Sequence, residues 1–132
     1  MTQLQALAVW MSVIAAGHVA LQVNVIINRR REKVGLGDGG NSRVLRAVRI
    51  HGNYLEQIPF TFAAFGLMSF AATPVWIVHA IGVMFVAARI AHAVGLSGSS
   101  GISRGRLFGV IGTWIVLVLA YSTALIRLFV IG

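Results

Sequence analysis

The sequence predicts an all-α integral membrane protein, a bundle of four transmembrane helices, from its composition, its apolar segments and the distribution of its charge. Of its 132 residues, 58% are hydrophobic and only 11% are charged, which is too apolar for a soluble domain of this length. Four apolar segments are each long enough to cross a hydrocarbon core about 30 Å thick. They cover residues 4–27, 43–71, 74–96 and 104–131, and the whole chain, 1–132, is expected to form a single membrane domain.

The net charge of +8 is concentrated in two of the three connections between these helices. Seven of the eleven basic residues lie between Arg29 and Arg49, and two more are Arg104 and Arg106. Four spans place both connections on one side of the membrane, and the positive-inside rule assigns that side to the cytoplasm. We therefore expect a multi-pass protein with both termini outside, whose charge reflects orientation and not nucleic acid binding. The sequence has no cysteine, so disulfides, thiolate metal sites and a cysteine nucleophile are excluded, and no metal is expected.

The first helix is followed by the basic run NRRREK. Such a run is typical of an anchor that fixes orientation and touches anionic membrane lipids. One of its arginines, Arg30 or Arg31, can also turn inward to meet an anionic ligand at the helix end. The next residues, GLGDGGNS, are predicted to form a flexible connection in which Asn41 or Ser42 caps the second helix.

The second helix carries a polar stripe. Arg46, Arg49, Asn53 and Glu56 follow one another at intervals of three or four residues, so all of them lie on one face of a helix. Ionised groups are costly in hydrocarbon, and this face must therefore meet a partner helix, a water-filled cavity or a charged ligand. The stripe is the candidate site, and Pro59 is expected to kink the helix just beyond it.

The third and fourth helices add basic groups at the same end. Arg89 and His92 lie one turn apart near the cytoplasmic end of the third helix. Snorkelling would explain Arg89 alone, and an ion pair with Glu56 or a shared ligand is an equal alternative. The fourth helix begins with Arg104 and Arg106 and is otherwise apolar. Five arginines thus surround one glutamate, a set that favours a ligand with two carboxylates and one amine.

The second helix also carries a family resemblance. RIHGNYLEQIP, residues 49–59, resembles the R-x-x-x-N-x-x-E-x-x-P signature of the MAPEG family, the membrane-associated proteins of eicosanoid and glutathione metabolism. GDGGNSRVLRA and ARIAHAVGL are similar to its bacterial branch, and the similarity covers nearly the whole chain. The resemblance implies a homotrimer in the inner membrane, with glutathione as co-substrate bound between neighbouring subunits on the cytoplasmic side.

The resemblance also implies roles for individual residues. Its glutathione site, extended by the neighbouring polar groups of the stripe and the third helix, corresponds to Arg30, Arg31, Arg46, Arg49, Asn53, Glu56, Arg89 and His92. Glu56 is the natural partner of the glutathione amino group. Arg104 or Arg106 matches the arginine proposed to stabilise the thiolate, because a nearby cation lowers the pKa of a thiol and so ionises the nucleophile. His92 and Leu96 stand where eukaryotic synthases have tyrosines, which argues against their particular eicosanoid activities.

Three functions fit these observations. The first is a membrane glutathione transferase or peroxidase that adds the activated thiol to a lipophilic electrophile dissolved in the bilayer. The second is a non-catalytic membrane protein of the same architecture that binds glutathione or a lipid. The third is a small proton-coupled exporter, although exporters of this size carry their carboxylate on the first helix without arginines beside it. The sequence favours the first.

Overall fold

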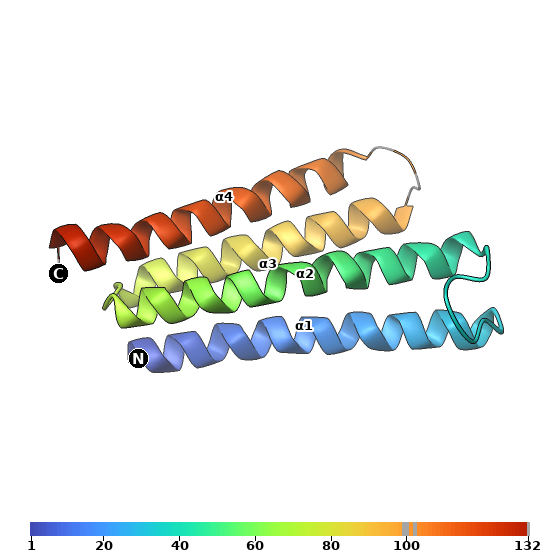
Figure 1. The fold of residues 1–132 in the computed structure, drawn as a ribbon, viewed down its shortest axis with the longest axis horizontal. Coiled ribbons are helices and arrows are strands. Elements are labelled where there is room, and N and C mark those ends of the chain that lie inside the picture. Colours follow the sequence, from blue (N-terminus) through green and yellow to red (C-terminus); the bar gives the residue numbers. More distant parts are fainter. Residues whose placement is uncertain (99–100, 102, 132) are drawn as a thin grey trace.

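The computed structural model describes all residues except 99–100, 102 and 132, and every regular element in the described part is helical. The helices are α1 (Gln3–Arg31), α2 (Ser42–Phe70), α3 (Val75–Gly98) and α4 (Arg104–Ile126), and a short π-helix, η1 (Arg127–Ile131), continues α4. Successive helices run antiparallel in an elongated bundle (Figure 1). The predicted all-helical membrane fold is confirmed.

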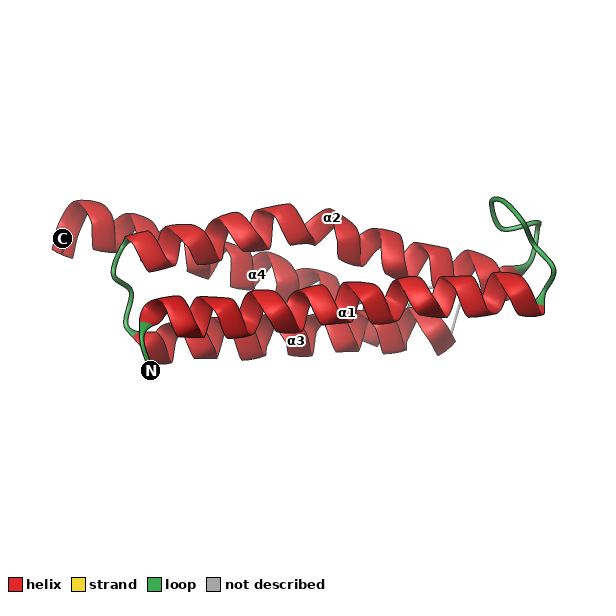
Figure 2. Cartoon of the chain, turned by 90° about the horizontal axis from the view of Figure 1, so that it is seen from below, coloured by secondary structure: helices red, strands yellow, loops and turns green. Residues whose placement is uncertain are grey.

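The two ends of this bundle differ in composition. Both chain termini and the connection between α2 and α3 lie at one end, which we call the terminal end (Figure 2). The connection between α1 and α2 lies at the other end, together with the last turn of α3 and the first turn of α4 (Figure 1). We call this the basic end, because it holds the NRRREK run and the arginines of α2 and α4.

Among the described residues, three segments are long and apolar enough to cross a membrane: α1, α3 and Arg104–Val130. The exception is α2, whose first half carries Arg43, Arg46, Arg49 and Glu56. It is nevertheless as long as α1, at 29 residues, and contacts each of the other three helices. The chain stays helical across Pro59, so its polar half reaches the basic end and its apolar half the terminal end.

Capping residues explain where the helices begin and end. Thr2, Asn41 and Ser103 accept hydrogen bonds from N–H groups in the first turns of α1, α2 and α4. At the end of α1 the backbone turns in a Schellman motif, with Lys33 (φ 55°) in the left-handed position that glycine usually occupies. Ala72 (φ 51°) takes the same place after α2.

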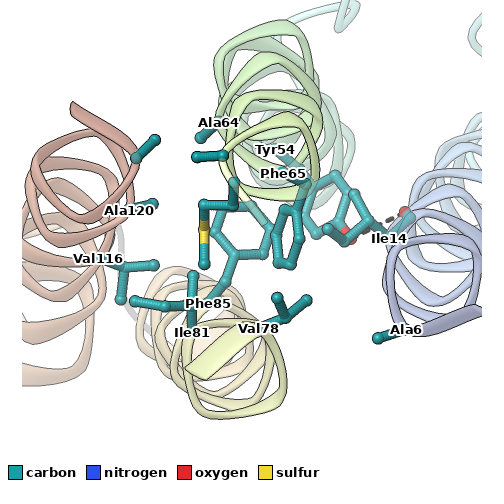
Figure 3. Packing of buried hydrophobic residues seen from close by; sticks show 13 residues of the cluster. Ala6, Ile14, Tyr54, Ala64, Phe65, Val78, Ile81, Phe85, Val116 and Ala120 are labelled. Carbon is teal, nitrogen blue, oxygen red and sulfur yellow. Dashed lines mark hydrogen bonds between the residues drawn. The ribbon is translucent and has the colours of Figure 1, made fainter. Parts of the chain in front are cut away.

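The hydrophobic core lies between all four helices and includes Ala6 and Ile14 of α1 (Figure 3). Phe65 of α2 and Phe85 of α3 are almost completely buried at its centre. On the other side of α2, the Tyr54 hydroxyl donates to the Ile14 carbonyl at 2.9 Å and so joins α1 to α2 (Figure 3). This core holds the polar half of α2 in a fixed position at the basic end.

Glycines let α3 and α4 approach closely at the basic end. A Cβ added to Gly109 would lie 2.5 Å from the backbone nitrogen of His92, and one added to Gly95 would collide with the backbone nitrogen of Arg106. Gly105 and Gly109 have the four-residue spacing that is common where membrane helices pack closely. This contact brings the start of α4 against the end of α3 and thereby positions His92 and Arg106.

Candidate functional site

A pocket of about 550 Å³ opens at the basic end between α2, α3 and α4. We call it the arginine pocket. Its wall on α2 is the polar stripe predicted from helical spacing, and α3 and α4 each add one polar group. The polar lining residues are Arg46, Arg49, Asn53, Glu56, His92 and Arg106. The fold therefore gathers most of the expected site residues into one cavity.

Several charged groups in this pocket have no partner. Arg49, Glu56 and Arg106 are exposed, and their side chains form no ion pair or hydrogen bond within the described part of the chain. Guanidinium groups bind carboxylates strongly, and a carboxylate binds an ammonium group in the same way. The cavity is thus arranged for a ligand that carries both negative and positive charge.

Arg89 lies behind the pocket wall, where it is only 4% exposed. Its Nη2 donates to Asn53 Oδ1 at 2.7 Å and its Nη1 donates to Thr113 Oγ1 at 3.0 Å. The ion pair with Glu56 that we expected as one alternative is not formed, because Arg89 donates to Asn53 and Thr113 instead. Arg89 is therefore a positioning residue for Asn53 and does not line the cavity.

This arrangement fixes the orientation of the Asn53 amide. A guanidinium group can only donate, so the amide oxygen of Asn53 must face Arg89. The amide NH2 group has no partner in the described structure and is left for a ligand. Thr113 in turn donates to the Gly109 carbonyl at 2.7 Å, so the support for Asn53 extends through α3 into α4.

His92 contributes a second unsatisfied polar group. Its side chain lines the arginine pocket although the residue is only 2% exposed, and its Nδ1 atom is buried without a hydrogen-bond partner. A buried polar atom in this state costs free energy unless a ligand or a water molecule satisfies it. His92 is therefore a candidate contact for a molecule bound in the pocket.

The remaining expected site residues lie outside this pocket. Arg104 is exposed and does not line it, whereas Arg106 does, so the geometry favours Arg106 of the two candidates near the thiol. Arg30 and Arg31 are exposed in the last turn of α1 and are not brought to the pocket by a single chain. Their contact with glutathione stays a prediction.

Sequence reasoning missed Thr113. It holds Arg89 in place from α4, and it is only 1% exposed. A weak signal exists in the sequence, since this hydroxyl lies four residues after Gly109, on the same face of an otherwise apolar helix. That face packs against α3.

Comparisons with known proteins agree with the signature on α2. Residues 7–126 match the model of the MAPEG family. The chain is 34% identical over 96 residues to the Inner membrane protein YecN of Escherichia coli strain K12, and the aligned region covers 73% of this chain and 72% of that protein. The protein of the same name from Escherichia coli O6:H1 matches to the same extent. No solved structure matches the chain. Since the family match spans nearly its full length, this chain belongs to the MAPEG family.

Proposed function

We propose that this protein is a membrane-bound glutathione transferase or peroxidase. It binds glutathione in the arginine pocket, ionises the thiol and directs it at a lipophilic electrophile dissolved in the bilayer. The observation that supports this proposal is that the guanidinium groups of Arg49 and Arg106 and the carboxylate of Glu56 lie in one open cavity without a side-chain partner among the described residues. Glutathione has two carboxylates, one ammonium group and one thiol, and these charges complement the cavity.

Each part of the peptide has a suitable partner. Arg49 binds a glutathione carboxylate and Glu56 binds the ammonium group, since both side chains are exposed to the pocket. The NH2 group of Asn53 donates to a carbonyl or carboxylate oxygen of glutathione, because the amide oxygen of Asn53 already accepts a hydrogen bond from Arg89. The buried Nδ1 atom of His92 gains a partner from the bound peptide or from a water molecule that the peptide holds.

Arg106 is the residue we assign to the thiol. The thiolate is the nucleophile, and a guanidinium group beside it stabilises the ionised form. With an aryl halide, the sulfur forms a bond to the ring carbon and the halide leaves with the bonding electron pair. With a lipid hydroperoxide, the sulfur attacks the terminal peroxide oxygen, the O–O bond breaks, and the lipid alkoxide leaves and is protonated by water. A second glutathione then attacks the resulting glutathione sulfenic acid, which gives glutathione disulfide and water.

The site is completed by a neighbouring subunit in this proposal. The arginine pocket has walls from α2, α3 and α4, and the exposed face of α2 continues from Glu56 to Phe60, which is 59% exposed. A carboxylate on the outer face of a membrane helix is costly without a partner. In a homotrimer, Arg30 or Arg31 of the adjacent copy closes the pocket and binds the second glutathione carboxylate. The positive-inside rule places this site on the cytoplasmic side.

Turnover by purified protein tests the proposal. We expect the protein in lipid nanodiscs to conjugate glutathione to an aryl halide or to reduce a lipid hydroperoxide. Arg106→Ala should lose this turnover, and Arg104→Ala is the matched control, because its side chain lies outside the pocket and most of the turnover should remain. A preparation that binds glutathione but shows no turnover above background with either class of electrophile would overturn the catalytic assignment.

A second candidate is a non-catalytic protein that binds a lipid or glutathione. It is supported by the apolar part of the pocket lining, which consists of Leu45, Val48, Gly52 and Leu96. Calorimetry separates the two functions. Glutathione or fatty acid binding that is unchanged when Arg104 and Arg106 are both replaced by alanine, with no accompanying chemistry, favours the binding protein.

A further inference from the structure

A second cavity, of about 250 Å³, lies at the basic end between α1 and α2, with one residue from the end of α3. We call it the amide pocket, after the two asparagines of α1 in its lining. It shares only Arg46 with the arginine pocket. Its lining residues are Asn24, Asn28, Arg43, Arg46, Ala47, Ile50 and Ser97, and none of these described residues is acidic.

The two asparagines leave one amide group free. Asn28 donates from its Nδ2 atom to the Asn24 carbonyl at 2.8 Å and to Asn24 Oδ1 at 3.0 Å. Because the Oδ1 atom of Asn24 is turned toward Asn28, the NH2 group of Asn24 points elsewhere, and it has no partner within the described residues. The cavity therefore offers neutral N–H donors beside its guanidinium groups.

Arg43 is held only weakly by its acidic neighbour. The distance from Arg43 Nη1 to Glu32 Oε1 is 3.7 Å, longer than a hydrogen bond, and the Arg43 side chain is half exposed. Glu32 makes a shorter contact with Asn41, which donates to its Oε2 atom at 2.9 Å. An exposed ion pair of this kind contributes little free energy. An anion in the cavity can therefore recruit Arg43 without a large cost.

The surroundings of the amide pocket are apolar. Ala47 and Ile50 are buried at its inner side. On α1, Val23 and Ile27 flank Asn24 in the sequence, and their side chains are 45% and 52% exposed. This helix is among those apolar enough to cross a membrane, so its exposed apolar side chains face lipid chains or another subunit. A polar anion site is thus adjacent to apolar surface at the basic end.

We propose that the amide pocket binds the phosphate group of an acidic phospholipid from the leaflet that the basic end faces. Arginine and amide N–H groups together suit phosphate oxygens, and the exposed apolar surface of α1 suits the acyl chains. The same N–H groups can also donate to inorganic phosphate, so the test includes both a phospholipid and free phosphate. The proposal does not depend on glutathione or on catalysis, and its outcome is independent of the function proposed above.

The test compares three variants of the detergent-solubilised protein. The thermal midpoint is measured against short-chain phosphatidylglycerol, phosphatidylcholine and inorganic phosphate, and the midpoint without additive reports whether each variant is folded. Arg43→Gln removes a charge from the cavity, and Asn24→Leu removes an N–H donor without changing the charge. Lys33→Gln is the matched control, since it removes a charge from an exposed residue at the same end that does not line the cavity.

We expect phosphatidylglycerol to stabilise the protein more than phosphatidylcholine does. Arg43→Gln and Asn24→Leu should each weaken phosphatidylglycerol binding about fivefold, and Lys33→Gln should weaken it less than about twofold. Stabilisation by inorganic phosphate that equals that by phosphatidylglycerol and is lost in Asn24→Leu supports the phosphate site and identifies a free anion as its occupant.

Two results would overturn the proposal. Equal losses in Arg43→Gln and Lys33→Gln, with none in Asn24→Leu, would show that diffuse charge at the membrane surface explains the lipid preference. The absence of any preference for phosphatidylglycerol or response to phosphate in the folded wild-type protein would exclude the site directly. Arg43→Lys, which keeps the charge, replaces Arg43→Gln as the test variant if the latter does not fold.

Discussion

The two ends of the bundle use polar side chains in opposite ways. At the terminal end, polar groups hold the backbone together. Gln3 Nε2 donates to the Thr73 carbonyl at 2.7 Å, and Arg127 Nε donates to the Ala71 carbonyl at 3.3 Å. Both acceptors lie in the turn that follows α2, where carbonyl groups lack partners within the helix. At this end an arginine is part of the fold.

At the basic end, two arginines of the arginine pocket are not used in this way. Arg49 and Arg106 have no side-chain partner in the described part of the chain, and Glu56 is equally unpaired. Arg89, which lies behind the pocket wall, is buried and donates to the side chains of Asn53 and Thr113. The comparison teaches that Arg127 is structural, because it donates to a backbone carbonyl, whereas Arg49 and Arg106 line a cavity and are available to a ligand. Five substitutions test this distinction.

The largest effect is expected from Arg49→Ala and Glu56→Ala. Each removes a charged group that we propose binds glutathione, and a charge-assisted hydrogen bond of this kind contributes up to about 3 kcal/mol, so affinity should fall about 100-fold. The thermal midpoint without ligand should stay within about 2 °C of the wild-type value, because neither side chain has a partner to lose. Calorimetry with glutathione measures the first effect. Normal binding by both variants would show that the stripe is only a packing surface.

Gly52→Leu changes the shape of the arginine pocket and is expected to leave the fold intact. Gly52 lines the arginine pocket, and a Cβ added there meets open space. A leucine would fill part of the cavity, so we expect glutathione binding to weaken roughly tenfold or more. Because glycine is a poor helix residue, stability should rise by about 1 kcal/mol. Unfolding in a denaturant series gives the second value, and a loss of stability would contradict this account of the pocket.

Thr113→Val tests the support behind Asn53. The substitution removes the acceptor of Arg89 Nη1, and leaving a buried donor unpaired costs about 1–3 kcal/mol. We expect reduced thermal stability and weaker glutathione binding together. Thr123→Val is the control on the same helix, since its hydroxyl makes no described hydrogen bond and neither property should change. A drop in stability without any change in binding would show that Asn53 does not contact the ligand.

Trp10→Phe is expected to have the smallest effect, and only on stability. Trp10 Nε1 donates to His79 Nδ1 at 3.0 Å near the terminal end, and its ring packs over Gly82. Its loss should cost about 1–2 kcal/mol and leave glutathione binding unchanged. Trp76→Phe, at a 72% exposed position, should change stability by less than about 0.5 kcal/mol. A change in glutathione affinity in Trp10→Phe would contradict the distinction between a structural terminal end and a ligand-binding basic end.

The fold could be predicted from the sequence because its determinants are local. Apolar segment lengths and basic connections predicted the helices and the end at which they gather their charge. Helical spacing also predicted the stripe, since Arg46, Arg49, Asn53 and Glu56 form one wall of the pocket. Both properties depend on residues close together in the chain and need no knowledge of how the helices pack.

The side-chain contacts between helices could not be predicted from the sequence. The partners of Arg89 depend on how closely α3 and α4 approach, which is set by Gly95 and Gly109. The difference between Arg104 and Arg106 depends on the rotation of α4, because two residues differ by about 200° around a helix axis. Sequence alone gives neither the separation of two helices nor their rotation about their axes.

The fixed amide of Asn53 also determines what the pocket selects. With its oxygen bound to Arg89, this side chain can offer only protons, and it cannot rotate to suit a different molecule without leaving the Nη2 group of the buried Arg89 without an acceptor. Selectivity from such a contact is strong, because the wrong group leaves both sides unsatisfied. Of two compounds alike in size and charge, the one with a lone pair at that point is retained, and the one with a hydrogen there is excluded.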